Sequence, residues 1–260
     1  TPVTLRTPLE SDFKLTPEQL EAAITPKTKM LVICSPSNPT GSVYTQDELN
    51  ALAEVVKKHD GMYVLSDEIY EHINYVGFKA SIASAPGMKE RTIICNGVSK
   101  AYAMTGWRLG WVAAPEWIVK GMNKLQGQYT SGTNDVAQRA ALAAYKGDQQ
   151  CVEDMRAAFQ RRRDLIVKLA KEIPGLEVNV PQGAFYLFPH CKKLFGKGYG
   201  EYKIKTSTDF AMYLLQEAHV ATVAGDAFGE PDGFRMSYAT SDDNIREALR
   251  RIKDACEKLK

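Results

Sequence analysis

TIICNGVSKAYAMTGWRLGWVA, residues 92–113, joins an apolar segment to a lysine and an arginine. The run Thr92–Cys95 predicts a short buried strand, which ends at Asn96-Gly97. Lys100 follows among small and apolar residues, and because burial disfavours the ammonium form of lysine, we expect its amine to be a nucleophile. Arg108 is a candidate for binding a dianion through two parallel hydrogen bonds, although two solvated cations after a strand would give the same pattern.

Upstream of this segment, apolar strands followed by polar turns alternate with helices that begin at capping boxes. The expected strands are Met30–Cys34, Tyr63–Leu65, Thr92–Cys95 and Leu109–Ala113. The expected helices run from Thr16 to near Ile24 and from Thr45 to about Lys58. This alternation indicates an α/β fold, and we expect parallel strands joined by right-handed crossovers.

Polar side chains follow the first three strands, at the edge where open α/β sheets bind ligands. They are Asn38, Asp67, Tyr70 and Lys100. A carboxylate can keep a pyridine nitrogen protonated, a phenol and an amide can stabilise a ring oxygen, and a lysine amine can form a Schiff base. With Arg108 for the phosphate, the set has a partner for each polar group of pyridoxal phosphate. Each residue alone is more often a cap, turn or packing residue, so only their joint order favours this cofactor.

The second half of the chain has a different pattern, with short strands and a long charged helix. The expected helices are Pro115–Gln126, Asn134–Tyr145, Gln149–Glu172, Ser207–Glu217 and Asp243–Leu259. The expected strands are Leu176–Val180, Ala184–Phe188, Val220–Val223 and Phe234–Ser237. We expect Arg161–Arg163 on a solvated helix face, a surface loop at Lys192–Lys205, and a domain boundary near Asp148 that separates residues 1–148 from 149–260.

Composition narrows the classes of partner. The 260 residues are 44% hydrophobic and 25% charged with a net charge of +2, which suggests neither a nucleic-acid partner nor an acidic tail. No apolar run approaches the roughly 20 residues that span a bilayer. Five scattered cysteines predict reduced thiols in the cytoplasm, and four isolated histidines show no metal-binding spacing.

The joint motif set resembles the class I, fold-type I pyridoxal-phosphate aminotransferases, and among them the bacterial aspartate aminotransferases. The stretches that carry this resemblance are SPSNPTG (35–41), SDEIY (66–70), NGVSK (96–100), MTGWR (104–108), PQGAFY (181–186) and FRMSYA (234–239). The resemblance implies a mainly parallel large domain that binds the cofactor and a smaller α+β C-terminal domain. It also implies a homodimer acting on an amino acid and a 2-oxo acid.

The resemblance assigns roles to single residues. Lys100 would hold the cofactor covalently and then shuttle protons, with Asp67 and Tyr70 as the other catalytic residues. Asp67 would pair with the ring nitrogen, while Tyr70 and Asn38 would bond the ring oxygen. Arg108 would bind the phosphate. The substrate would be held by Arg235 at its α-carboxylate, and Phe185 and Asn38 would line its site, although an aromatic residue in a strand is by default part of a core.

Two departures from the family pattern stand out. Many members have a hydroxyl residue three positions before the lysine as a phosphate ligand, where this chain has Gly97, and the neighbouring Ser99 is a candidate replacement. Members also begin about a third of a chain earlier, with a phosphate loop and a ring-stacking aromatic residue. We therefore expect an N-terminally incomplete large domain. The segment Tyr129–Ser131 resembles the one lent to the phosphate of a neighbouring subunit, so this chain alone is expected to bind the cofactor weakly and not to transaminate.

Aspartate and 2-oxoglutarate are the substrate pair that the motif subgroup implies. The alternatives are an aromatic or broad-specificity aminotransferase, an aminotransferase-like effector domain of a transcription regulator, and a fragment that folds incompletely. We also expect a cis bond between Asn38 and Pro39, because the turn must aim the Asn38 side chain at the cofactor ring and cis costs only about 0.5–1 kcal/mol before proline.

Overall fold

The computed structural model describes residues 1–260, which form two compact units. Unit 1 consists of Thr1–Phe13, Asn38–Ser42 and Ala157–Lys260, and unit 2 consists of Lys14–Ser37 and Val43–Arg156. The division falls inside one helix, α5 (Gln150–Lys171). A division by compactness does not test the domain boundary predicted near residue 148, which stays a prediction.

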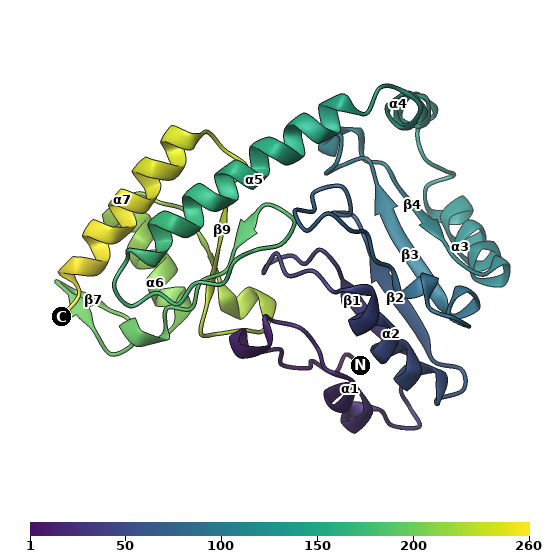
Figure 1. The fold of residues 1–260 in the computed structure, drawn as a ribbon, viewed down its shortest axis with the longest axis horizontal. Helices are drawn as coiled ribbons and strands as arrows, with labels where there is room; N and C mark the ends of the chain where they lie inside the picture. Colours follow the sequence, from purple (N-terminus) through teal and green to yellow (C-terminus); the bar gives the residue numbers. More distant parts are fainter. The chain divides into compact units, whose positions relative to one another are not determined.

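The core element of unit 2 is a four-stranded sheet in the order β1-β2-β3-β4 (Figure 1). Its strands are β1 (Met30–Cys34), β2 (Tyr63–Asp67), β3 (Thr92–Gly97) and β4 (Gly110–Ala113). The first three are parallel, as the sequence predicts. The expectation of a parallel fourth strand is wrong, because β4 runs antiparallel to β3 with Gly97 opposite Gly110. The connection 98–109 has only a short 3-10 turn (Thr105–Trp107), whereas a parallel return usually needs a helix.

Two capped helices precede and follow β1. Helix α1 (Pro17–Ala23) and helix α2 (Gln46–Lys57) both begin with the predicted capping boxes, at Thr16 and Thr45. Helix α2 buries one side of its surface, which includes Leu49, Leu52, Ala53 and Val56. Short 3-10 turns, Ile82–Ser84 and Lys89–Arg91, lead from the Tyr70 region into β3.

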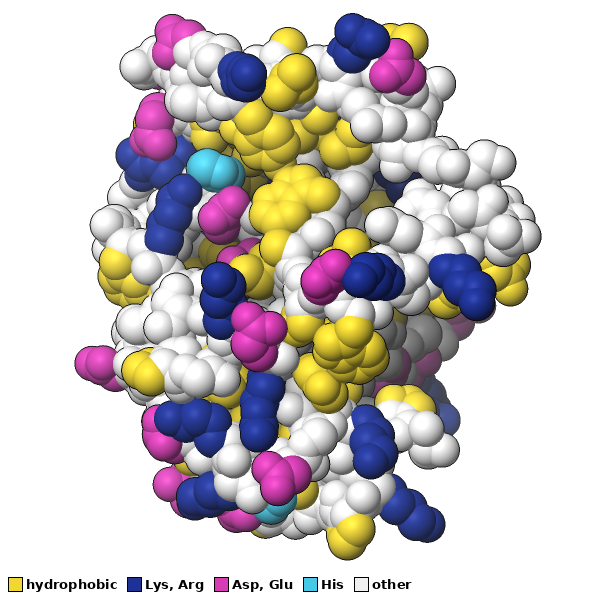
Figure 2. Space-filling model, turned by 90° about the vertical axis from the view of Figure 1, so that its right-hand side faces the viewer, with side chains coloured by type: hydrophobic (Ala, Val, Ile, Leu, Met, Phe, Trp, Pro, Cys, Tyr) yellow, Lys and Arg dark blue, Asp and Glu magenta, His cyan; other side chains and the backbone are white.

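The segment after β3 is far less covered. Helix α3 (Glu116–Tyr129) has no buried residue, every residue of β4 is exposed, and helix α4 (Asp135–Lys146) buries only two alanines. Large apolar side chains at the surface here are Trp111, Val112, Trp117, Leu125, Tyr129, Val136 and Leu142, which we call the apolar face. Figure 2 shows hydrophobic side chains gathered on the side of the molecule where α3 and α4 lie. A groove of about 600 Å³ runs between β4, α3 and α4.

Unit 1 is an α+β arrangement around a small antiparallel sheet in the order β5-β9-β8. Its strands are β5 (Tyr186–Leu187), β8 (Val223–Ala224) and β9 (Phe234–Ser237). Helix α6 (Ser207–Tyr213) continues as one π-helical segment, Leu214–Ala218, and helix α7 (Asp242–Lys258) closes the chain. Aromatic rings fill the core, among them the fully buried Phe188, Phe210, Tyr213, Phe234 and Tyr238.

Several predictions for unit 1 need correction. The strand expected at Leu176–Val180 is absent, because only Glu177 forms a bridge, with His190. The loop expected at Lys192–Lys205 contains a hairpin of β6 (Gly198–Tyr199) and β7 (Tyr202–Lys203).

The predicted solvated run Arg161–Arg163 is only partly solvated. Arg161 and Arg162 donate to the Asp242 carboxylate, and Arg163 donates to the carbonyl of Pro181. None of the helices combines the length and apolar composition that crossing a bilayer requires. All five cysteines remain thiols.

Candidate active site

The ends of β2 and β3 bring two of the predicted residues together in unit 2. Tyr70 lies three residues beyond the end of β2, and Lys100 lies three residues beyond the end of β3. The Lys100 Nζ atom is 5.8 Å from the centre of the Tyr70 ring. Tyr70 is only 3% exposed, whereas Lys100 is half-buried. The lysine therefore reaches the strand edge with part of its side chain in solvent, less enclosed than the sequence suggested.

Asp67, the last residue of β2, lies in a row of side chains across the sheet. Cys34 of β1 and Cys95 of β3 are its register partners, so the two thiols flank the carboxylate on one sheet face. The Asp67 Oδ1 atom accepts a hydrogen bond of 3.1 Å from the Ile69 N–H, which fixes the start of the turn. Burial raises the pKa of the Cys95 thiol, and the Asp67 charge raises it further. Cys95 therefore stays a neutral neighbour of the carboxylate.

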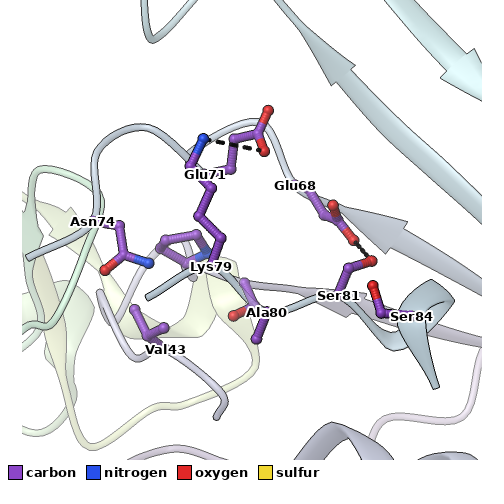
Figure 3. A pocket seen from close by; sticks show the side chains of 10 residues that line it. Val43, Glu68, Glu71, Asn74, Lys79, Ala80, Ser81 and Ser84 are labelled. Atoms are coloured by element: carbon purple, nitrogen blue, oxygen red, sulfur yellow. Dashed lines mark hydrogen bonds and ion pairs between the residues drawn. The ribbon is translucent and has the colours of Figure 1, made fainter. Parts of the chain in front are cut away.

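A buried carboxylate follows Asp67 and was not anticipated from the sequence. Glu68 is 8% exposed, and its Oε1 atom accepts hydrogen bonds from Ser66 Oγ at 2.9 Å and Ser81 Oγ at 2.6 Å. Burial raises the pKa of Glu68, and the two serine hydrogen bonds offset part of that rise. The side chain lines a pocket of about 130 Å³ together with Glu71 and Lys79 (Figure 3).

A second unanticipated carboxylate joins the two turns. The Glu71 Oε1 atom accepts a hydrogen bond of 2.7 Å from the side-chain amide of Asn96, at the end of β3. Both residues lie in or beside the quoted motifs, but their pairing depends on the register of β2 and β3. No spacing along the sequence reveals that register.

The proposed phosphate ligands differ in their surroundings. Ser99 is half-buried. Arg108 is exposed, has a left-handed backbone with φ 53°, and donates from Nη1 to the Thr105 carbonyl at 3.0 Å. The missing hydroxyl at Gly97 has a steric reason, because a Cβ atom there would lie 2.9 Å from the Gly110 Cα atom and 2.9 Å from the Leu109 carbonyl oxygen. A serine or threonine at position 97 would therefore require β3 and β4 to move apart.

Unit 1 holds the other predicted residues, and it joins two of them directly. Arg235 Nη1 donates a hydrogen bond of 2.8 Å to Asn38 Oδ1, although the two residues are far apart in sequence. The guanidinium carbon lies 4.5 Å from the ring centre of Tyr186 and 4.9 Å from that of Phe228. Aromatic rings at these distances attract a guanidinium and limit its rotation. Tyr186 and Phe228 are thus neighbours of Arg235 that sequence reasoning missed.

The turn that bears Asn38 is tied into unit 1 by backbone hydrogen bonds. The Gly41 carbonyl accepts from the N–H groups of Gln182 and Gly183, at 2.8 and 2.9 Å. Gly41 has φ +71°, and a Cβ atom there would overlap the side chain of Pro181, so this position requires glycine. The Asn38-Pro39 bond is cis, as predicted, and the Ser35-Pro36 bond is also cis, which was not predicted.

Phe185 packs in an aromatic cluster. Its ring centre lies 5.3 Å from that of Phe159 and 4.6 Å from that of Tyr186. The residue is half-buried, so part of its ring remains accessible. The packing explains its aromatic character, while a contact with substrate remains a prediction.

Residues 1–252 match the family model described as aminotransferase class I and II. The chain belongs to this family. An aspartate aminotransferase of Rhizobium meliloti is 47% identical over 99% of this chain and 64% of its own length. An aspartate/prephenate aminotransferase of Cereibacter sphaeroides is 47% identical over the whole chain and 66% of its own length. This member of the aminotransferase family thus spans about two thirds of the length of these relatives.

Solved aminotransferase structures match the fold. The crystal structure of the Rhizobium meliloti aspartate aminotransferase superposes with a TM-score of 0.94 at 46% identity, over 97% of this chain and 64% of that one. An aromatic aminotransferase from Pyrococcus horikoshii gives a TM-score of 0.92 at 42% identity, over 98% of this chain and 67% of that one. The expected fold-type I architecture, a mainly parallel α/β sheet with an α+β part, is therefore confirmed.

Proposed function

We propose that this chain carries the cofactor-binding and catalytic residues of a pyridoxal-phosphate-dependent aminotransferase. The proposed reaction moves an amino group from aspartate to a 2-oxo acid such as 2-oxoglutarate. Family membership supports the reaction class, and the names of the relatives from Rhizobium meliloti and Cereibacter sphaeroides support aspartate. We also predict a homodimer in the cytoplasm.

The observation that carries this proposal is the meeting of Lys100 and Tyr70 beyond the carboxyl ends of two parallel strands. A lysine that forms a Schiff base with the cofactor and a phenol that bonds its ring oxygen must both contact the same pyridine ring, so the two side chains must lie close together. The 5.8 Å from Lys100 Nζ to the Tyr70 ring centre fits a pyridine ring that contacts both side chains. Asp67 ends the strand that leads to Tyr70, so the same edge also offers a carboxylate.

The residues present fit pyridoxal phosphate by their chemistry. When bound, this cofactor supplies an electron sink for the amino acid. Lys100 would hold it covalently and move a proton at the substrate, Asp67 would keep the ring nitrogen protonated, and Tyr70 would donate to the ring oxygen. Arg108 and Ser99 would bind the phosphate. Asn38, whose Oδ1 atom accepts from Arg235, is proposed as a further partner of the ring oxygen.

Arg235 is proposed to bind the substrate carboxylate, with Asn38 and Phe185 beside it. Its guanidinium donates one N–H to Asn38 and lies next to the rings of Tyr186 and Phe228. The remaining donors can form a two-pronged bond with a carboxylate. Aromatic amino acids are the second candidate substrates, because the Pyrococcus horikoshii relative is named an aromatic aminotransferase.

Borohydride trapping tests the cofactor site. The purified chain is incubated with pyridoxal phosphate, reduced, digested and mapped by peptide mass. We expect the pyridoxyl group on Lys100, no label at this position in Lys100→Arg, and normal labelling of Lys100 in the control Lys79→Arg. Equal labelling of many surface lysines, without preference for Lys100, would contradict the proposal.

Kinetics with competing amino acids tests the substrate. In any preparation of the protein that shows transaminase activity, aspartate should outcompete tyrosine as the amino donor to 2-oxoglutarate. Arg235→Ala should raise KM for the amino acid roughly 10- to 100-fold, as expected for the loss of a charged hydrogen bond. A preference for tyrosine would favour the aromatic alternative instead.

A further inference from the structure

The segment that carries Lys100 has little regular structure of its own. It leaves β3 as a turn, residues 98–103, in which Tyr102 N–H donates to the Val98 carbonyl at 3.3 Å and Ala103 N–H donates to the Lys100 carbonyl at 3.2 Å. We call this segment the Lys100 turn. Both distances lie at the long end of the usual range for N–H···O hydrogen bonds.

The neighbouring Tyr70 turn, residues 68–73, is bonded more tightly. Glu71 N–H donates to the Glu68 carbonyl at 2.9 Å, and Ile73 N–H donates to the Tyr70 carbonyl at 2.8 Å. Glu71 follows Tyr70 directly in this turn. The backbone hydrogen bonds of the Tyr70 turn are therefore shorter than those of the Lys100 turn.

One amide links the two turns. Asn96 is 8% exposed, and its Nδ2 atom donates to Glu71 Oε1 at 2.7 Å. Its Oδ1 atom accepts from the Gly97 N–H, also at 2.7 Å, immediately before the Lys100 turn begins. The Asn96 amide nitrogen thus donates to the Tyr70 turn, and its amide oxygen accepts from the backbone that leads to Lys100.

We propose that Glu71 is a positioning residue, which holds the Lys100 turn against the Tyr70 turn through Asn96. A hydrogen bond to an ionised carboxylate is about twice as strong as one between neutral groups. Its donor is nearly buried, so losing the acceptor would leave that donor without a partner in a place that water reaches poorly. The effect of Glu71 on cofactor binding rests on the proposed function. Its effect on the position of the Lys100 turn does not depend on the proposed function.

Charged groups on the outer side of Glu71 contribute less. Lys79 Nζ lies 4.0 Å from Glu71 Oε2, and Figure 3 shows this ion pair among the side chains that line the pocket. His72 Nε2 lies 3.4 Å from Glu71 Oε1, and burial lowers the pKa of His72 most strongly, followed by the Lys79 charge. Lys79 is mostly exposed, so this ion pair is screened by solvent. The bond to Asn96 therefore carries the positioning, and Lys79→Ala is a suitable control.

Four variants separate the acceptor from the charge. Glu71→Ala removes the acceptor, whereas Glu71→Gln keeps a carbonyl oxygen for Asn96 and loses only the charge. Asn96→Asp places two carboxylates within hydrogen-bond distance of each other. The double variant Glu71→Gln/Asn96→Asp restores a donor and an acceptor with the direction of the bond reversed, and the carboxylate introduced at position 96 can still accept from the Gly97 N–H.

Hydrogen exchange measured by mass spectrometry tests the turn without any cofactor. Amides in peptides covering residues 97–103 should exchange at least about tenfold faster in Glu71→Ala and in Asn96→Asp than in the wild type, as expected for one lost charged hydrogen bond. Glu71→Gln, Lys79→Ala and the double variant should stay within about threefold of the wild type. Peptides of α7 serve as an internal reference. Unchanged exchange at 97–103 in both disruptive variants would overturn the inference.

Borohydride trapping then separates this inference from the proposed function. At a cofactor concentration that labels half of the wild-type Lys100, Glu71→Ala should lose most of the label and the double variant should recover it. If wild-type protein shows no preference for Lys100 while the exchange pattern holds, the proposed function fails and the positioning role stands. If Glu71→Ala does not fold, Asn96→Asp and its rescue by Glu71→Gln decide the matter, and absence of rescue in exchange overturns the inference.

Discussion

Glu68 is a carboxyl group that folding removes from water. Because burial raises its pKa in the folded chain, the folded state holds this proton more tightly than the unfolded state does. The stabilisation linked to this proton is complete below the unfolded pKa and is lost as the pH rises through the folded value. Glu68→Gln keeps an acceptor for Ser66 and Ser81 without the charge, so it should unfold at a higher temperature than the wild type at pH 7. The difference should shrink toward pH 4, as melting curves across that range would reveal.

The pKa of the Cys95 thiol can report the charge of the neighbouring Asp67 carboxylate. The Asp67 charge is the second cause, after burial, of the raised pKa of the Cys95 thiol. Asp67→Asn should therefore lower this pKa, so that alkylation of Cys95 by iodoacetamide reaches half its maximal rate at a lower pH than in the wild type. Peptide mapping distinguishes Cys95 from Cys151, the exposed thiol that serves as a control. An unchanged Cys95 profile would show that the two side chains do not interact.

At the scale of residues, the sequence predicted which side chains lie together at the site. It did not predict the hydrogen bonds that hold them in place. Asp67, Tyr70 and Lys100 could be predicted at one edge because each follows a recognisable strand. The bonds from Glu71 to Asn96 and from Arg235 to Asn38 could not be predicted, since they depend on strand register and on contacts between distant segments.

Helix α2 illustrates how local chemistry sets an element. Thr45 Oγ1 accepts from the Glu48 N–H at 3.2 Å, and Glu48 Oε2 accepts from the Thr45 N–H at 2.7 Å. Thr45→Ala removes one half of this box and should lower the free energy of unfolding by about 1 kcal/mol, whereas Thr45→Ser should lower it much less. Urea titrations followed by circular dichroism give both values, and equal stability of all three proteins would contradict the capping role.

At the scale of elements, helices were predicted well because capping boxes and apolar periodicity are local signals. The direction of a strand depends on its connection to its neighbour and not on its own sequence. We expected β4 to be parallel, but the connection 98–109 contains no helix that could carry a parallel crossover. The extended segment around Glu177 failed as a strand for a related reason. Its residues have strand-like character, but only one of them finds a bridging partner.

The apolar face leaves several large hydrophobic side chains in solvent. Leu125 and Val136 are 62% and 64% exposed, in a region where α3 buries nothing. Large apolar side chains with this much exposure favour self-association. Leu125→Lys combined with Val136→Lys should reduce concentration-dependent light scattering and binding of a hydrophobic dye, while changing stability by no more than about 0.5 kcal/mol per site. Glu257→Lys, at an exposed position of α7, adds the same net charge as the double variant and is a matched control that should leave both signals unchanged.

The same apolar face has a calorimetric consequence. Unfolding raises the heat capacity because it wets apolar groups that the folded state keeps dry, and 260 residues would ordinarily give about 3–4 kcal/mol/K. Trp111, Trp117, Leu125 and their neighbours are already partly wet before unfolding begins. Scanning calorimetry should therefore find a smaller increment than this range, and the curve of stability against temperature should be flatter than for a typical protein of the same length.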